Sequence, residues 1–275
     1  MTAAQKRRRV TKAAITAGWT VFLLLYLFPY IWMVLTGLRR PVDTLAMRVW
    51  FSPTLDGFRT IFGEIGFGGY LANSIVVAGS VTVVALAVAA PAAYALTRLG
   101  RSGRVFLGAV LVARTVPAIA ILVPIYLVAS GAGLLDTRAV LVVIYTAFNL
   151  PFAIWLLRGF FRDVPREVRE AAVIDGCGEW QVFRRMMLPL VTGGIVATGV
   201  FVFIAAWNEF LFALALTQSD AATAPLAIVG FRSEYGVQWG AIGAASLTIS
   251  TPVVLFAIAM QRYLVRGLTM GSVKG

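Results

Sequence analysis

The sequence predicts an all-helical membrane protein, and three observations lead to this fold class. Of its 275 residues, 60% are hydrophobic and only 13% are charged, whereas soluble domains carry about 25% charged residues. Uncharged runs recur along the chain, and about 20 helical residues are enough to cross a bilayer. The net charge of +12 gathers on one side of the membrane when these runs are treated as spans. We therefore predict a single transmembrane domain, residues 1–275, with six helices.

The spans follow from the distribution of charged residues. Five runs contain no charge, and a sixth is interrupted only by Arg114. The first run is too long for a signal peptide and no small-residue cleavage site follows it, so we expect it to remain as a helix. The predicted spans are 14–36, 72–96, 106–129, 139–157, 191–216 and 241–262.

The arginines and lysines predict the orientation, because loops rich in these residues stay in the cytoplasm. With the N-terminus inside, the inner segments hold 17 basic and 5 acidic residues, and the outer loops hold 6 of each. The two charges left within spans, Arg114 and Glu209, cancel. The whole net charge is then cytoplasmic, both termini lie inside, and no nucleic-acid partner is needed to explain it.

Composition also excludes several kinds of chemistry. The chain has one cysteine, Cys177, and no histidine. A disulfide framework, a zinc site built from histidine and cysteine, and catalysis by an imidazole base are therefore excluded. A phosphate-binding loop is excluded too, because none of the lysines, Lys6, Lys12 and Lys274, follows a glycine.

The inner loop 158–190 differs from the others because it is long and helical. Pro165 suits the first position of one short helix, and Gly176 suits its C-terminal cap. A second helix, about 179–188, leads to Pro189 and the fifth span. Two adjacent small side chains, Ala171 and Ala172, leave room for a partner. Three acidic side chains, Glu167, Glu170 and Asp175, lie at the rim. The loop is either a docking surface or a helix lying on the lipid headgroups.

A family resemblance favours docking. Glu170-Ala171-Ala172, then Gly176, then Leu188-Pro189, resembles the "EAA" loop of ABC importer permeases, with Met186 where that pattern usually has isoleucine. In that family the loop is a coupling helix that sits in a cleft of the cytoplasmic ATPase. The resemblance implies that the coupling residues are Glu167, Glu170, Ala171, Ala172, Asp175, Gly176, Leu188 and Pro189.

The remainder of the chain is similar to the carbohydrate-uptake branch of these inner-membrane components, specifically its shorter permease of the maltose/trehalose type. The matching segments are Asn73-Ser74, Ala93-Tyr94-Ala95-Leu96, Trp207-Asn208-Glu209-Phe210 and the C-terminal tail from Gln261. The resemblance implies a multi-pass protein of the bacterial inner membrane that is not itself an enzyme and binds no cofactor. ATP and Mg would bind to two copies of a partner ATPase. The other implied partners are a homologous second permease, an extracytoplasmic solute-binding protein and the lipid bilayer.

The candidate solute path starts from Arg114, about nine residues into the third span. An intramembrane arginine costs about 2.5–3.5 kcal/mol on insertion scales, so it should face a water-filled cavity or a partner. It either lines the path or makes a structural pair, for example with the second permease. Glu209 is not its expected partner, because the two lie about 14 Å and about 27 Å from the inner edge. Pro117 and Pro124 indicate that this span lines a cavity.

Further path candidates lie on the fourth and fifth spans. Trp207 has a ring that can stack on a sugar, and Asn208, Glu209 and Asn149 have polar groups that can bind hydroxyls. A secondary transporter would leave the EAA loop unexplained, and a membrane enzyme would need clustered catalytic groups that the sequence does not show. The solute class stays open among sugars, oligosaccharides, polyols and glycerol-phosphate esters.

Overall fold

The structure, a computed structural model, describes residues 3–46, 50–233 and 236–269. The chain forms two compact units. The first contains the N-terminal segment to Gly66 together with Gly230–Thr248, and the second contains Phe67–Val229 and the segment from Ile249. Each unit is described separately.

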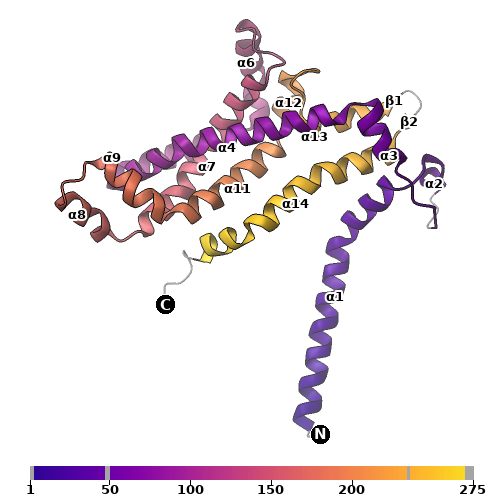
Figure 1. The fold of residues 1–275 in the computed structure, drawn as a ribbon, viewed down its shortest axis with the longest axis horizontal. Coiled ribbons are helices and arrows are strands. Elements are labelled where there is room, and N and C mark those ends of the chain that lie inside the picture. The colour runs from indigo at the N-terminus through magenta and orange to yellow at the C-terminus, as the bar shows by residue number, and fades with distance from the viewer. Residues whose placement is uncertain (1–2, 47–49, 234–235, 270–275) are drawn as a thin grey trace. The chain divides into compact units, whose positions relative to one another are not determined.

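The second unit is built from helices (Figure 1). The long ones, α4, α7 and α11, run side by side and carry short helices at their ends. Their bounds are α4 Phe67–Arg98, α5 Gly100–Ala113, α6 Ala118–Gly131, α7 Arg138–Asp163, α8 Arg166–Ile174, α9 Glu179–Val182, η2 Phe183–Met187, α10 Leu188–Leu190, α11 Thr192–Trp207, α12 Leu211–Leu216 and α13 Ala224–Ala227.

One end of this unit, which we call the Asp136 end, is held together by hydrogen-bonded polar side chains. The carboxylate of Asp136 accepts hydrogen bonds from the four consecutive backbone amides of residues 218–221, at 3.0–3.1 Å. The side-chain amide of Asn73, at the start of α4, donates to the carbonyl oxygens of Asp220 and Ala222. Arg138, at the start of α7, donates to Asn73. The loop between α12 and α13 is thereby fastened to α4 and α7.

The opposite end, which we call the Glu179 end, brings together the last turns of α4 and α7 with the loop that follows α7. Tyr94 of α4 packs on Phe161 of α7 and on Phe183, with ring centroids 5.7 and 5.4 Å apart. The guanidinium of Arg158 lies 3.4 Å from the carbonyl oxygen of Leu96. Because α4 and α7 both run from the Asp136 end to the Glu179 end, the α5–α6 pair and the α11–α12 pair must run back.

Small residues let α4 and α7 lie close together. Ala78, Ala85, Ala89 and Ala93 of α4 are all fully buried and recur every four or seven residues, so they share one helix face. Membrane helices pack through such small-residue faces because lipid supplies no hydrophobic force between them. Large side chains of α7, among them Tyr145, fill the remaining space of the core.

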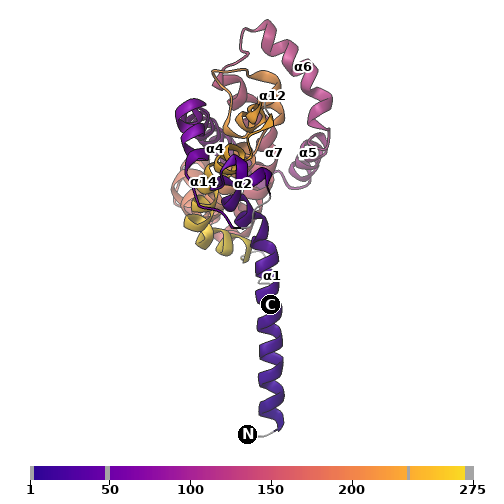
Figure 2. The same cartoon turned by 90° about the vertical axis from the view of Figure 1, so that its right-hand side faces the viewer.

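The predicted spans fit the helices unevenly. Spans 72–96 and 139–157 each lie within one long helix, α4 and α7, and spans 14–36 and 241–262 lie within α1 and α14. The third predicted span, 106–129, is wrong as a continuous helix. It divides into α5 and α6, of 14 residues each. Figure 2 shows the bend between them. Pro117, which lacks a backbone donor, stands at the N-cap of α6.

The fifth predicted span, 191–216, is also interrupted, because α11 ends at Trp207 and α12 starts at Leu211. Among the described residues, four helices are long and apolar enough to cross a membrane. The number becomes five if Glu179–Leu190 and Thr192–Trp207, bent by 77°, form one broken span. The total of six spans and the cytoplasmic termini therefore stay predictions.

The first unit contains α1, several short elements and the first residues of α14. The end of α1 approaches the start of α14 so closely that a Cβ on Gly37 would lie 2.9 Å from the backbone nitrogen of Ala244, and one on Gly243 2.5 Å from that of Gly37. Glycine is required at this crossing. The bounds are α1 Ala3–Gly37, α2 Pro41–Leu45, α3 Asp56–Arg59, η1 Thr60–Glu64, η3 Ile228–Phe231, β1 Arg232–Ser233, β2 Gly236–Val237 and α14 Trp239–Thr269.

Candidate functional site

The loop 158–190 contains the predicted coupling helix, and local sequence explains its ends. Pro165, predicted to be the first residue of this helix, stands instead at the N-cap of α8, so the helix starts one residue later, at Arg166. At the other end Gly176 adopts a φ of +82°, which glycine reaches at little cost. The amides of Gly176 and Cys177 donate to the carbonyl oxygens of Val173 and Ala172, at 3.0 Å each. This Schellman motif confirms the predicted C-terminal cap.

The two adjacent alanines of α8 have different surroundings. Ala171 is exposed, but Ala172 is 1% exposed and belongs to the core cluster of the second unit. Successive residues of a helix point about 100° apart, so one neighbour faces inward when the other faces out. The expectation that both leave room for a partner is corrected here, because Ala172 lets α8 pack against its own chain.

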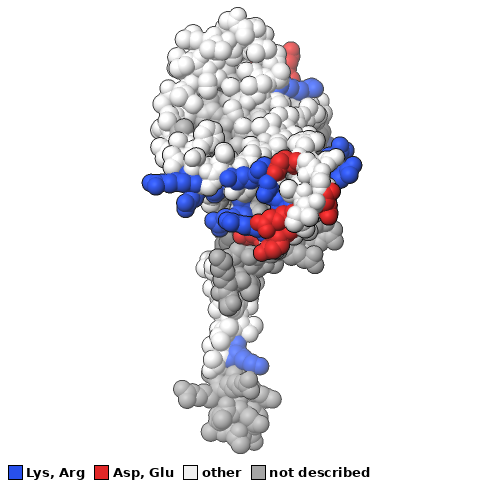
Figure 3. Space-filling model, turned by 90° about the vertical axis from the view of Figure 1, so that its left-hand side faces the viewer, with Lys and Arg blue, Asp and Glu red and all other residues white. Residues whose placement is uncertain are grey.

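The outward face of the loop carries acidic and large apolar side chains. Glu167, Glu170 and Asp175 are exposed, as predicted for the rim. Ile174 is 86% exposed and Trp180 is 62% exposed, although both lie on a segment that is otherwise strongly charged. Figure 3 shows the charged side chains gathered around this end of the molecule. Exposed apolar residues inside a polar rim are typical of protein contact sites.

Glu179 joins this loop to the end of α4. Its carboxylate lies 2.8 Å from the guanidinium of Arg98, accepts a hydrogen bond from the hydroxyl of Tyr94 at 3.1 Å, and pairs with Arg169 of α8. The hydrogen bond from Arg169 lowers the pKa of Glu179 below its usual range. Partial burial opposes this shift, and the hydrogen bond from Tyr94 and the charge of Arg98 add to it. One carboxylate therefore connects the predicted coupling helix to a membrane-spanning helix.

Sequence reasoning did not single out Glu179, because its partner Tyr94 lies 85 residues away in the chain. The one clue to the role of Glu179 in the sequence was its position at the start of the second loop helix. The loop residues Leu188 and Pro189 lie in α10, with Leu188 half-buried against the core and Pro189 exposed. They mark the turn through which the loop enters α11.

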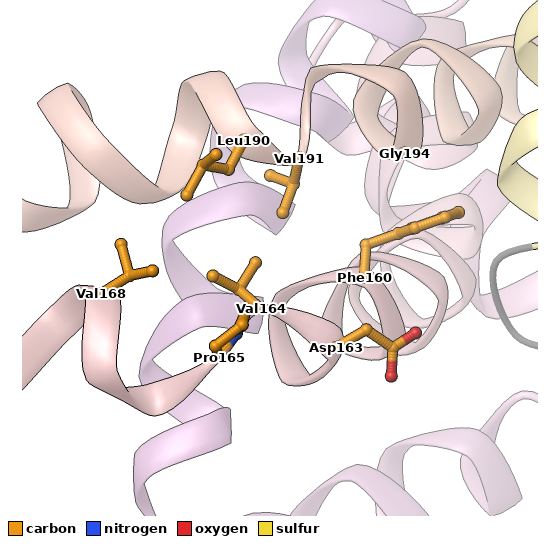
Figure 4. Close-up of a pocket in the computed structure, with 8 residues that line it drawn as sticks. All are labelled: Phe160, Asp163, Val164, Pro165, Val168, Leu190, Val191 and Gly194. Carbon is orange, nitrogen blue, oxygen red and sulfur yellow. The ribbon is translucent and has the colours of Figure 1, made fainter. Parts of the chain in front are cut away.

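An apolar cavity of about 250 Å³ lies between the end of α7, the start of α8 and the α10–α11 junction (Figure 4). A Cβ on Gly194 would lie 2.3 Å from the ring of Phe160, so only glycine lets α11 approach α7 here. The carboxylate of Asp163 points away from Val168 and Val164. The lining residues are Phe160, Asp163, Val164, Pro165, Val168, Leu190, Val191 and Gly194.

The candidate path residues lie near two helix breaks. Arg114 stands at the end of α5, directly before the break, and its guanidinium carbon lies 5.3 Å from the centre of the Phe152 ring of α7. Phe212, just after the break between α11 and α12, lies 4.8 Å from Phe148, one turn earlier on α7. Both breaks therefore lie beside the middle of α7. Interrupted backbone at membrane depth is tolerated where it is buried in protein or faces water.

The other candidates are satisfied within their own segments. Asn149 is buried and donates to the carbonyl oxygen of Tyr145, and Asn208 is exposed and donates to that of Ile204. The carboxylate of Glu209 accepts from the backbone amide of Phe212 at 3.0 Å, which caps the start of α12. The structure thus gives Glu209 and Arg114 separate partners.

Trp207 is 1% exposed and stacks on Phe203 with ring centroids 5.5 Å apart. In this conformation its ring faces no open space, so its contact with a solute stays a prediction. Among the described residues, no three His, Cys, Asp or Glu side chains form a group that could hold a metal ion.

A family model described as "Binding-protein-dependent transport system inner membrane component" matches residues 82–270. The chain belongs to this family. It is therefore a multi-pass component of a bacterial inner membrane, and a permease subunit rather than an enzyme. The match includes α7, the loop 158–190 and both helix breaks.

Curated relatives support the same membership. The chain is 57% identical over 269 residues to the probable ABC transporter permease protein y4oR of Sinorhizobium fredii (strain NBRC 101917 / NGR234), with 97% of each chain covered. It is 38% identical to the trehalose transport system permease protein SugB of Mycobacterium tuberculosis (strain CDC 1551 / Oshkosh), over 90% of this chain and 93% of the relative.

A solved structure shows the same fold. It is a bacterial ABC transporter involved in the import of the acidic polysaccharide alginate, with a TM-score of 0.76 and 21% identity over 96% of this chain and 98% of that one. The prediction of an all-helical ABC importer permease fold is confirmed.

Proposed function

We propose that the chain is the permease subunit of an ATP-driven importer that moves a sugar or a related solute into the cytoplasm. The observation that carries this proposal is the family match over residues 82–270, which includes the exposed loop 158–190. The trehalose permease that is 38% identical over nearly the whole chain supports a carbohydrate solute.

The partners follow from a division of labour. Since this sequence holds no phosphate-binding loop, ATP and Mg would bind to two partner ATPase subunits. A homologous permease would complete the membrane part, and a solute-binding protein would deliver the solute from outside. No cofactor is proposed for this chain. Import then proceeds by alternating access, in which helices rearrange around a central path as the ATPases move.

The α8–α9 face is the proposed contact with the ATPase. Exposed Ile174 and Trp180 supply apolar area, and Glu170 and Asp175 supply the charged rim. Movement of this face would reach the membrane through Glu179, which ties α8 to α4 by way of Arg169 and Tyr94. Gly176 would set the angle between α8 and α9.

Co-purification with the candidate ATPase tests this assignment. The variant Glu170→Ala with Ile174→Asp alters only exposed side chains, so it should fold normally and lose both the complex and binding-protein-stimulated hydrolysis. The matched control Glu64→Ala removes an exposed carboxylate in the segment before α4 and should behave as wild type. An intact complex and full activity in the double variant would show that docking takes place elsewhere.

The solute path is tested separately by uptake into vesicles that contain the whole transporter. Arg114 and the two helix breaks beside α7 would line this path, with Asn208 and Glu209 at the second break and Asn149 and Trp207 nearby. Arg114→Ala should abolish uptake while the complex with the ATPase persists. Near-normal uptake would assign Arg114 a structural role against Phe152 instead.

A further inference from the structure

A second cavity at the Glu179 end is lined by arginines. It measures about 450 Å³ and lies between the ends of α4 and α7 and the start of α8. Its charged lining residues are Arg98, Arg162, Arg166, Arg169 and Glu170. The lining thus holds four guanidinium groups and one carboxylate, and Glu179, which pairs with two of the arginines, supplies a second carboxylate.

The arginines differ in the partners that their side chains have. Arg98 and Arg169 are paired with Glu179. Arg162 and Arg166 make no ion pair or side-chain hydrogen bond with any residue that the structure describes, although both line the cavity. The Nε of Arg169 is buried without a hydrogen-bond partner. Arg166 also opens α8, where the first backbone amides have no intrahelical partner and carry the positive end of the helix dipole.

The position of the cavity indicates what it binds. Two helices that are long and apolar enough to span a membrane, α4 and α7, end at its wall, so we infer that it lies near the lipid headgroups. Leu99 and Phe106, next to it on the chain, are exposed apolar residues suited to lipid. Val164 and Pro165 line both this cavity and the apolar one of Figure 4, so apolar space adjoins the arginines. Basic pockets between membrane helices recognise anionic lipid headgroups.

We propose that the arginine cavity binds the phosphate of an anionic phospholipid, with Arg162 and Arg166 as the main ligands and an acyl chain along the adjoining apolar wall. Guanidinium groups suit this role because each presents paired donors to phosphate oxygens. The cavity adjoins the proposed ATPase contact and shares Glu170 with it, but the apolar residues of that contact, Ile174 and Trp180, do not line the cavity. It does not depend on the nature of the transported solute.

Retained lipid is the measurement that tests this proposal. The transporter, purified with its partner subunits, is washed in neutral detergent, and bound phospholipid is identified by mass spectrometry. Wild type should retain phosphatidylglycerol or cardiolipin in preference to neutral lipid. Arg162→Gln with Arg166→Gln should retain about tenfold less, since charge-assisted hydrogen bonds to phosphate are lost. Arg184→Gln with Arg185→Gln removes the same charge from η2, outside the cavity, and should retain lipid as wild type does.

Three outcomes would overturn the proposal. Equal retention by both double variants would mean that the cavity is not the lipid site. Displacement by millimolar inorganic phosphate, with no preference among lipids, would assign the cavity to free phosphate. Lipid bound only when the ATPase is absent would assign it to an acidic segment of that partner. If the glutamine variant fails to fold, Arg162→Lys with Arg166→Lys keeps the charge but not the paired donors and should retain lipid at an intermediate level.

Discussion

At the Asp136 end of the second unit, one carboxylate accepts hydrogen bonds from four consecutive backbone amides, whereas at the Glu179 end one carboxylate holds three side chains. Backbone amides are fixed by the fold, so their hydrogen bonds cannot rearrange without unfolding the loop. Exposed side-chain ion pairs contribute little energy and are easily remade. The comparison indicates a fastened loop at one end and, at the other, a loop that is connected but free to move with a partner.

The largest loss of stability is expected from a substitution at the Asp136 end. Asp136→Ala should lower the free energy of unfolding by about 3 kcal/mol, because four amides lose a charged acceptor and only the exposed ones regain water. Thermal unfolding in detergent measures the change. Asp220→Asn is the control, since among the described residues its carboxylate accepts a hydrogen bond only from the hydroxyl of Ser219. Similar stability of the two variants would remove the distinction between the ends.

The second-largest loss of stability is expected from a change in packing near the Glu179 end. Gly194→Ala should cost about 2 kcal/mol, because the new Cβ would overlap the ring of Phe160 and force it into the apolar cavity. Gly193→Ala is matched in chemistry and in helix, and its Cβ meets nothing within 4 Å. The control should be neutral or slightly stabilising. If both variants behave alike, the close approach of α7 and α11 is not needed.

A substitution in the turn between α8 and α9 should lower the stability by a smaller amount. Gly176→Ala places a side chain at a φ of +82° and should cost about 1 kcal/mol. Gly178→Ala is the comparison, because Gly178 has an ordinary φ of −69° and open space around it. Unfolding and ATPase co-purification are measured together. A stability loss without a change in binding would separate the turn geometry from docking.

The smallest loss of stability is expected at Glu179, whose ion pairs connect α8 to α4. Glu179→Gln should cost less than about 1 kcal/mol, since its ion pairs are partly exposed, yet it should reduce stimulated hydrolysis and uptake together. Because the folded pKa of Glu179 lies below its unfolded value of about 4.3, its contribution is present above that pH and is lost as the pH falls through the folded value. The difference from wild type should be constant between about pH 5 and 8 and should shrink below about pH 4.

A large stability loss from Glu179→Gln with unchanged uptake would reverse this interpretation. The carboxylate would then be a structural clamp like Asp136. The pKa of Asp136 is also low, because the hydrogen bonds from residues 218–221 outweigh the opposing effect of burial. Both contributions are therefore present at neutral pH and are lost only as acid protonates the two carboxylates.

The sequence by itself determined the class of protein. Charge-free runs predicted four spans that each lie within one helix of the structure, because the cost of charge in a bilayer restricts where a span can lie. The order of residues from Glu170 to Pro189 identified the loop and its cap, since glycine at Gly176 reports a local backbone requirement. Both are local properties, and local properties can be read along the chain.

Only the tertiary structure decided what the side chains touch. Hydropathy counts side chains and not backbone geometry, so it missed the breaks at Pro117 and after Trp207. Ala171 and Ala172 look alike in the sequence, and packing against the core sets them apart. Trp207 has the chemistry of a sugar platform, yet its neighbours bury it. Glu179 and Asp136 acquire their roles from groups about 80 residues away, and such distant partners are brought together only when the helices pack.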